Sequence, residues 1–228
     1  MKTAIILAGG LGTRLKSVVQ DIPKPMAPVR GKPFVEYVLQ YLKIYGIEKI
    51  IFSIGYRGEV IQDYFGAEFN SMKIDYSIEE TPLGTGGGIY QAAMMCDDEP
   101  FLVLNGDTLF DIDLFKLSYL YEISNAEMVI GLKAMKDFDR YGIVELADDE
   151  RVIGFREKEY QKEGLINGGV YIFTKKIFEI ASFPNRFSFE KDFMEKYLDE
   201  IQMYGYEMEG YFIDIGIPED YAKAEKEL

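Results

Sequence analysis

The chain has 228 residues, of which 48% are hydrophobic and 28% charged, so its composition is that of an ordinary globular protein with one large domain. The formal net charge of −14 argues against a nucleic-acid-binding surface, which needs clustered lysine and arginine. The chain has no histidine and one cysteine, which excludes histidine-based catalysis and leaves oxygen atoms as the ligands of any metal site.

The apolar run near the N-terminus is short. Residues 3–8 (Thr-Ala-Ile-Ile-Leu-Ala) are followed at once by Gly9 and Gly10. Such a run is too short for a signal peptide core or a membrane helix, and we interpret it as a buried strand. The lone Cys96 cannot form a disulfide within the chain, which favours a reducing compartment. We therefore expect a cytoplasmic protein with no membrane segment.

Strand and helix patterns alternate through the first half of the chain. Strands are predicted over residues 3–8, 49–54, 73–78 and 101–104, and helices over 33–46, 59–65 and 86–95. This alternation predicts an α/β fold, namely a Rossmann-like, mostly parallel mixed sheet flanked by helices.

The second half is richer in strand patterns. Strands are predicted over residues 127–132, 142–146, 152–155, 165–173 and 205–214, with helices near 175–181, 189–199 and from Pro218 to the end. No proline- or serine-rich linker separates the halves, so a single domain is expected. The strand over 127–132 and later segments are candidate surfaces for a homodimer, a question that the sequence leaves open.

A glycine-rich loop follows the first predicted strand. It reads Leu7-Ala8-Gly9-Gly10-Leu11-Gly12-Thr13-Arg14. Three glycines in four positions let backbone N–H groups approach a polyphosphate, although a plain tight turn is the alternative. The cation at Arg14 favours the triphosphate interpretation. Farther on, two prolines hold the backbone on either side of Lys24, which is otherwise a solvated loop lysine.

Taken with later motifs, these residues resemble the sugar-1-phosphate nucleotidylyltransferase family. The motifs are Gly10-x-Gly12-Thr13-Arg14-Leu15, Pro23-Lys24-Pro25, Pro82-Leu83-Gly84-Thr85-Gly86, Asn105-Gly106-Asp107, Glu157-Lys158, Asn167-Gly168-Gly169 and Phe212-x-Asp214-x-Gly216-x-Pro218. Their order extends through nearly all of the chain. The resemblance implies the nucleotide-diphospho-sugar transferase type of fold over residues 1–228, with a nucleotide-binding half (1–115) and a sugar-phosphate-binding half (116–228).

The resemblance also implies roles for individual residues. Arg14, Lys24 and Asp107 would be catalytic, and Asp107 and Asp214 would bind Mg²⁺. The nucleotide would contact Leu7, Ala8, Gly9, Gly10, Gly12, Thr13, Glu79, Gly84 and Thr85. The sugar phosphate would contact Asn105, Gly142, Glu157, Lys158, Asn167 and Gly168. No general base is required, because a phosphate oxygen is already ionised near neutral pH, and cations together with a metal can stabilise the developing charge.

The Glu79-Glu80 pair before Pro-Leu-Gly-Thr-Gly resembles that of guanylyltransferases for mannose-type sugars. We therefore expect GTP and D-glycero-α-D-manno-heptose 1-phosphate as substrates, in the biosynthesis of GDP-heptose for a capsule or surface polysaccharide. Mannose 1-phosphate, or thymidylyl, uridylyl or cytidylyl transfer to another sugar phosphate, is the alternative. A molybdopterin guanylyltransferase and a catalytically silent regulatory subunit are further alternatives, which the sugar-type motifs and the presence of Arg14, Lys24, Asp107 and Asp214 disfavour.

Some of these residues also have purely structural interpretations. Asp107 could be a turn aspartate, and Asp214 could cap the helix that begins at Pro218. Glu79 and the Glu157-Lys158 pair could be solvated, and Glu80 could take the role given to Glu79. The aromatic Tyr171 and Phe173 are expected to belong to the core.

Overall fold

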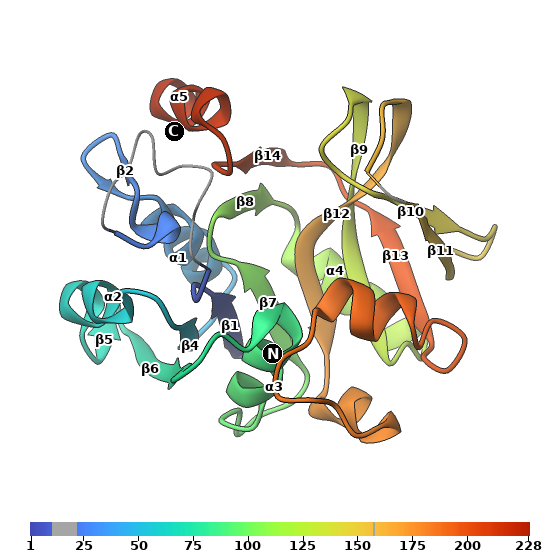
Figure 1. Cartoon of the computed structure of the whole chain (residues 1–228), viewed down its shortest axis with the longest axis horizontal. Helices are drawn as coiled ribbons and strands as arrows, with labels where there is room; N and C mark the ends of the chain where they lie inside the picture. Colours follow the sequence, from blue (N-terminus) through green and yellow to red (C-terminus); the bar gives the residue numbers. More distant parts are fainter. Residues whose placement is uncertain (11–21, 157) are drawn as a thin grey trace.

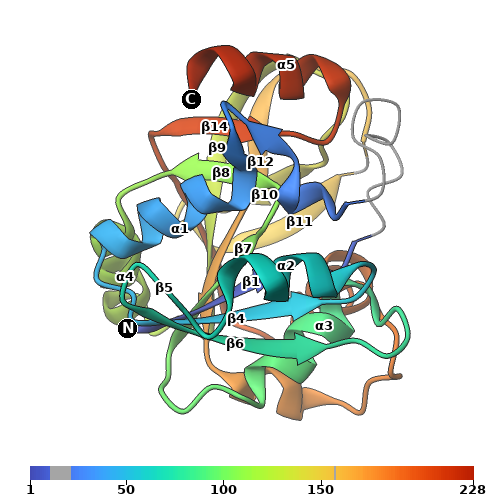
Figure 2. The ribbon, with the colours of Figure 1, turned by 90° about the vertical axis from the view of Figure 1, so that its left-hand side faces the viewer.

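A computed structural model describes residues 1–10, 22–156 and 158–228. In these residues one 10-stranded mixed sheet carries helices on both faces (Figures 1 and 2). Its strands are β1 (Thr3–Leu7), β4 (Lys49–Ile54), β5 (Glu68–Phe69), β6 (Met72–Ile78), β7 (Phe101–Asn105), β9 (Met128–Phe138), β10 (Ile143–Leu146), β11 (Val152–Arg156), β12 (Gln161–Phe173) and β13 (Met203–Glu207). Two short antiparallel ribbons pair β2 (Pro28–Val29) with β3 (Lys32–Pro33) and β8 (Thr108–Asp111) with β14 (Tyr211–Asp214).

The helices lie mostly between the strands of the first half. The α-helices are α1 (Phe34–Ile44), α2 (Gly58–Phe65), α3 (Gly84–Ala93), α4 (Leu114–Ile123) and α5 (Pro218–Glu227). Two short 3₁₀ helices, η2 (Lys24–Met26) and η3 (Lys175–Ile180), and a π-helix, η4 (Phe189–Glu195), complete the set. None of the described helices combines the length and apolar character that crossing a membrane requires.

The sheet confirms the predicted mixed α/β architecture. Its main path runs β11-β10-β12-β7-β1-β4-β6-β5, and β9 pairs with β12 and β13. Four strands of the first half, β7, β1, β4 and β6, are parallel to one another. β12 is antiparallel to β7, β9 and β10. Because β7 belongs to the first half of the chain and β9 and β10 to the second, β12 joins the two halves within one sheet.

Alternating side chains of the central strand β1 belong to two separate hydrophobic clusters, one on each face of the sheet. Ala4 and Ile6 of β1 point into a cluster that includes residues of α1 and α2, whereas Ile5 points into a cluster that includes residues of α3. All three are fully buried. A strand covered on both faces has no polar side, which explains the continuous apolar run in the sequence.

Three predictions about the second half need correction. Residues 205–214, predicted as one strand, form two, because the chain leaves β9 after Glu207 and pairs with β8 from Tyr211. The strand predicted over 127–132 cannot serve as a dimer surface, because Met128 to Leu132 are buried and pair with β12 on one side and β13 on the other. The helices predicted near 175–181 and 189–199 are a 3₁₀ helix and a shorter π-helix.

Candidate active site

The carboxyl ends of β1 and β7 meet at one edge of the sheet. Leu7 pairs with Asn105, and Gly106 donates its backbone N–H to the Leu7 carbonyl at 2.9 Å. The glycine-rich segment from Ala8 to the exposed Gly10 therefore begins beside the Asn-Gly-Asp motif. Open α/β sheets bind their ligands at such an edge.

Lys24 links two aspartates at this edge. Its Nζ lies 2.5 Å from Oδ2 of Asp107 and 3.4 Å from Oδ1 of Asp214. The β8–β14 ribbon brings the carboxylates together, because Asp214 is opposite Thr108 in its register and Ile215 donates its N–H to the Asp107 carbonyl. All three charged side chains are partly shielded, with 16–31% of their surface exposed. They form a small polar cluster open to a ligand.

Asp214 is held by further hydrogen bonds. The backbone N–H of Gly216 donates to its Oδ1 at 2.8 Å, and the hydroxyl of Tyr141 donates to its Oδ2 at 3.3 Å. Burial, together with the charge of Asp214, raises the pKa of Tyr141 above its ordinary value, so the hydroxyl remains a donor at neutral pH. The side chain of Asp214 makes no cap at the start of α5, and this alternative for its role is wrong.

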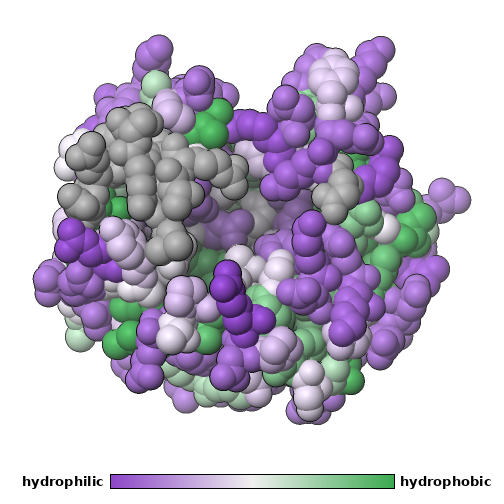
Figure 3. Space-filling view, in the orientation of Figure 1, coloured by the Kyte–Doolittle hydropathy of each residue, from purple (hydrophilic) through white to green (hydrophobic). Residues whose placement is uncertain are grey.

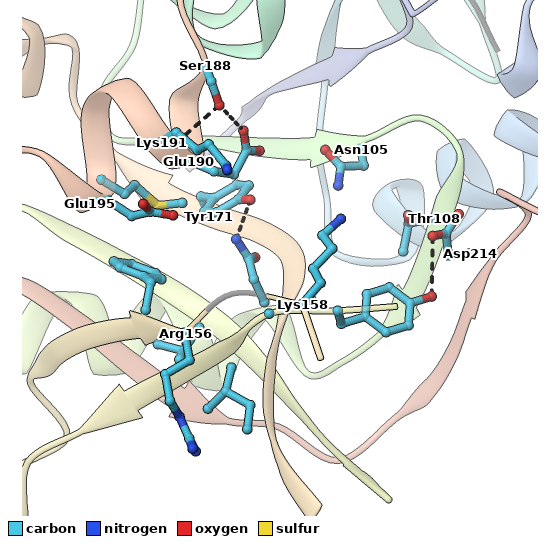
Figure 4. A pocket seen from close by; sticks show the side chains of 18 of the residues that line it. Asn105, Thr108, Arg156, Lys158, Tyr171, Ser188, Glu190, Lys191, Glu195 and Asp214 are labelled. Atoms are coloured by element: carbon cyan, nitrogen blue, oxygen red, sulfur yellow. Dashed lines mark hydrogen bonds between the residues drawn. The ribbon is translucent and has the colours of Figure 1, made fainter. Parts of the chain in front are cut away.

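A cavity of about 350 Å³ adjoins this cluster. Figure 3 shows a hollow near the centre of this face, with hydrophilic residues around it. In Figure 4, Lys158 extends into the cavity, whereas Ser188 and Glu190 lie along another side. Every described residue predicted to contact the sugar phosphate lines the cavity, together with one predicted metal ligand: Asn105, Gly142, Lys158, Asn167, Gly168 and Asp214.

The glycines of this cavity have packing reasons of their own. A Cβ at Gly142 would lie 2.6 Å from the Arg156 carbonyl, and one at Gly168 would collide with the ring of Phe110. Close backbone and ring contacts therefore already require glycine at both positions, in addition to the predicted contact with the sugar phosphate.

Asn167 is anchored at both ends of its amide. Its Nδ2 donates to the hydroxyl of Tyr171 at 2.8 Å, and its Oδ1 accepts from the N–H of Gly169 at 2.9 Å. Tyr171 and Phe173 are buried in the core, as predicted. The hydroxyl of Tyr171 nevertheless reaches the cavity wall, where it fixes the orientation of Asn167.

The carboxylate of Glu79 lies next to Gly9, at the start of the glycine-rich segment. Its Oε1 accepts from the Ser53 hydroxyl at 3.1 Å, and its Oε2 accepts from the Leu83 N–H at 2.9 Å. A Cβ at Gly9 would collide with this carboxylate. Glu79 is half-buried, whereas Glu80 is exposed. The interpretation of Glu79 as a solvated residue is therefore wrong.

The segment after Glu79 is attached to η4. Gly84 has a φ of +73°, and a Cβ there would lie 2.5 Å from the carbonyl of Phe187, so both conformation and contact require glycine. The hydroxyl of Thr85 donates to Oε2 of Glu190 at 2.8 Å and accepts from the N–H of Phe189 at 2.9 Å. Thr85, predicted to contact nucleotide, thus contacts Glu190 in the wall of the cavity.

Several predicted residues lie outside the described part of the chain, and their roles stay predictions: Gly12, Thr13, Arg14 and Glu157. Conversely, the motifs did not indicate several residues that line the cavity: Thr108, Arg156, Ser188, Glu190, Lys191 and Glu195. The one local signal was Ser188, whose hydroxyl accepts the N–H of Lys191 as a helix N-cap. That signal predicts a helix start and does not indicate what the helix faces.

Comparison with known proteins agrees with this arrangement. Residues 3–228 match the family described as nucleotidyl transferase. Over 225 residues the chain is 52% identical to the D-glycero-alpha-D-manno-heptose 1-phosphate guanylyltransferase of Aneurinibacillus thermoaerophilus, covering 99% of this chain and 97% of the relative. The enzyme of that name from Campylobacter jejuni is 50% identical over 218 residues, or 96% of each chain.

A solved structure is also similar to this chain over nearly its whole length. The crystal structure of HddC from Yersinia pseudotuberculosis complexed with GMP-PN superposes with a TM-score of 0.87 at 41% identity, covering 99% of both chains. The family match extends over nearly the whole sequence, and the relatives exceed 50% identity or reach it. The chain therefore belongs to the nucleotidyl transferase family.

Proposed function

We propose that the chain transfers GMP from GTP to D-glycero-α-D-manno-heptose 1-phosphate, giving the GDP-sugar and pyrophosphate. The observation that carries this proposal is the cluster of Lys24, Asp107 and Asp214, which lies near the carboxyl ends of β1 and β7 and adjoins the cavity lined by Lys158. Two anionic substrates bound on either side would meet at this cluster. The names of the relatives from Aneurinibacillus and Campylobacter support the choice of base and sugar.

The reaction needs positioning more than proton transfer. An ionised oxygen of the sugar phosphate forms a bond to the α-phosphorus of GTP, and the bond from that phosphorus to the bridging oxygen of pyrophosphate breaks. Lys24 would neutralise charge as it develops at the α-phosphate, and Lys158 would hold the phosphate of the sugar. Preorganised charges of this kind, in a partly shielded site, lower the barrier without a histidine base.

A divalent metal fits the same cluster. Magnesium commonly takes one or two protein carboxylates and completes its shell with substrate phosphate oxygens and water. Asp107 and Asp214 supply such a pair, and the described residues contain no group of three or more His, Cys, Asp or Glu side chains that could form a cage. When bound there, Mg²⁺ would neutralise charge on the phosphate oxygens of both substrates. We propose that these two aspartates hold it and that Lys24 shares them in its absence.

A screen of pyrophosphate release tests the proposal. GTP, ATP, UTP, CTP and dTTP are each combined with D-glycero-α-D-manno-heptose 1-phosphate, mannose 1-phosphate and glucose 1-phosphate in the presence of Mg²⁺. The highest kcat/KM is expected for GTP with the heptose phosphate. A higher value for mannose 1-phosphate would change the sugar, and a higher value for a pyrimidine nucleotide would contradict the choice of base. If the proposal holds, the product is an activated heptose, of use in building a capsule or surface polysaccharide.

A further inference from the structure

Glu190 is one of three described carboxylates that line the cavity, together with Glu195 and Asp214. It belongs to η4, is half-buried and lines the cavity on the side where Figure 4 shows Ser188. Its Oε2 accepts hydrogen bonds from the hydroxyls of Thr85 at 2.8 Å and Ser188 at 2.9 Å. Within residues 1–10, 22–156 and 158–228, no hydrogen bond to Oε1 is present. A fixed carboxylate therefore retains one oxygen for a ligand.

Charge decides what that oxygen can bind. A carboxylate repels phosphate and accepts hydrogen bonds from hydroxyl groups, and such charge-assisted bonds are stronger than neutral ones. Lys158 and Lys24 attract the phosphate instead. Arg156 and Lys191 also line the cavity. Because the proposed reaction takes place at the cluster of Lys24, Asp107 and Asp214, however, we expect the phosphate of the sugar there, and its hydroxyl-bearing ring toward Glu190.

The contact with Thr85 connects Glu190 to the nucleotide segment (residues 79–86), several residues of which are predicted to contact the nucleotide. Phe187 donates its N–H to the Leu83 carbonyl, and Gly86 donates its N–H to the Phe187 carbonyl, both at 3.0 Å. The Thr85 hydroxyl adds bonds to Phe189 and Glu190 in the same region. The segment that follows Glu79 and the segment that carries Glu190 are therefore joined by backbone and side-chain bonds.

Resting on the proposed function, we propose that Glu190 binds a hydroxyl of the acceptor sugar and that Thr85 is a positioning residue that holds it in place. Because Thr85 adjoins Gly84, a nucleotide that contacts the nucleotide segment also acts on the hydrogen bond between Thr85 and Glu190. Nucleotide and sugar phosphate then increase each other's affinity by the same factor, as thermodynamic linkage requires.

The test measures binding and turnover of D-glycero-α-D-manno-heptose 1-phosphate, with calorimetry carried out with and without a non-hydrolysable GTP analogue. The variants are Glu190→Gln, Thr85→Val and Thr85→Ser. Matched controls are Glu200→Gln and Thr81→Val, two exposed positions outside the cavity. Glu190→Gln should weaken sugar-phosphate binding and raise its KM roughly 10- to 100-fold, the range expected for loss of a bond to a charged group. The affinity for nucleotide alone should not change.

Thr85→Val should affect mainly the coupling. The increase in sugar-phosphate affinity caused by the GTP analogue should shrink severalfold, and Thr85→Ser, which keeps the hydroxyl, should restore it. Monodeoxy analogues of the sugar phosphate identify the bound hydroxyl: the analogue that lacks it should bind wild type and Glu190→Gln equally. Circular dichroism and thermal unfolding check that each variant is folded, and a variant that fails this check is replaced by Glu190→Asp.

Three results separate the inference from the proposed function. If wild type turns over the sugar phosphate and Glu190→Gln has an unchanged KM, the assignment of Glu190 is overturned. If Thr85→Val keeps the full coupling, the positioning role is overturned. If wild type shows no pyrophosphate release with any sugar 1-phosphate, the proposed function fails, and the inference fails with it.

Discussion

The ammonium group of Lys24 lies 2.5 Å from Oδ2 of Asp107, although the two residues are 83 positions apart in the chain. Two pieces of local structure create this contact. The prolines beside Lys24 restrict the backbone of η2, and Pro25 is buried, so the lysine side chain has a fixed origin. Asp107 follows β7 at the edge of the sheet. The pair is therefore present before any substrate binds.

The carboxylates of this cluster are expected to be essential. Asp107→Asn and Asp214→Asn each remove one negative charge next to Lys24 and one proposed metal ligand. Turnover should fall by at least roughly 10²-fold, the usual effect of losing a preorganised electrostatic group. Steady-state kcat measured over a range of Mg²⁺ concentrations checks this. Asp111→Asn, an exposed aspartate on the same ribbon, serves as the control and should behave as wild type. Wild-type rates in excess chelator would contradict the metal proposal.

Lys24→Met tests the lysine separately, because methionine keeps much of the length and removes the charge. We expect kcat to fall roughly 10²-fold, with weaker GTP binding as a smaller effect. Loss of the ammonium also leaves Asp107 and Asp214 without the cation that competes with Mg²⁺ for them, so the variant should need less Mg²⁺ for half-maximal activity. A change in the KM for GTP alone, with kcat retained, would mean that Lys24 contributes equally to ground-state and transition-state binding.

Tyr141 should influence the same aspartate indirectly. Tyr141→Phe removes the hydroxyl that donates to Asp214 and leaves the ring in its contacts. The Mg²⁺ concentration for half-maximal activity should rise severalfold, while kcat at saturating Mg²⁺ falls by less than about 10-fold, the scale of a single hydrogen bond. Tyr76→Phe is the matched control, since the Tyr76 hydroxyl bonds the Gly66 carbonyl far along the chain from the cluster. Identical Mg²⁺ curves for Tyr141→Phe and wild type would exclude this role.

Site residues that belong to short sequence motifs could be predicted from the sequence, whereas residues that only tertiary packing brings to the site could not. Asp107 and Asp214 are in short motifs, and a β-ribbon brings them together as the family resemblance implied. Glu190 had no such signal. A Glu-Lys pair in a predicted helix is ordinarily solvent-exposed, and only the packing of η4 on α3 places Glu190 in the cavity. Contacts between residues 105 positions apart, as for Thr85 and Glu190, depend on tertiary structure.

The elements of the fold also differ in how far the sequence predicts them. Strands β1 and β4 were predicted because burial on both faces makes them continuously apolar. Helix α4 was not predicted, because Phe115 and Tyr119 are exposed while Leu114 and Leu117 are buried, so apolar residues surround the helix without a clear stripe. Asp113, whose side chain caps the helix by accepting the N–H of Lys116, was the available signal.

Cys96 should be chemically silent in the folded protein. The thiol is buried, and burial raises its pKa to about 12. Because the folded pKa is raised above the unfolded one, the thiol is protonated in both states below about pH 8.5. The corresponding contribution to stability is complete at neutral pH and is lost as the pH rises toward 12. At pH 8, an aromatic disulfide reagent should react slowly with native protein and rapidly with one thiol per chain in denaturant. Fast reaction of the native protein would contradict this burial.

The last prediction concerns the base. Guanine presents adjacent N1–H and N2–H donors, and a carboxylate can accept both, whereas uracil and thymine present one N–H between two carbonyls, which suits an amide. Glu79 is already held by the hydroxyl of Ser53 and the N–H of Leu83, one bond to each oxygen, so its carboxylate is oriented while further lone pairs remain.

Glu79→Gln replaces one acceptor oxygen by an NH₂ group, which repels a guanine donor and also loses one of these two supporting bonds. We expect kcat/KM for GTP to fall by roughly 10- to 100-fold, corresponding to about 1–3 kcal/mol for a bidentate base contact. Activity with UTP or dTTP should fall less or rise, so the preference for guanine narrows. Glu80→Gln, at the exposed neighbouring position, is the control and should keep the wild-type preference.

The measurement that checks this prediction is kcat/KM for GTP, ATP, UTP, CTP and dTTP with one sugar phosphate. Loss of activity in Glu79→Gln that is equal for all five nucleotides would assign the carboxylate to support of the loop. A guanine preference unchanged from wild type would show that another group reads the base.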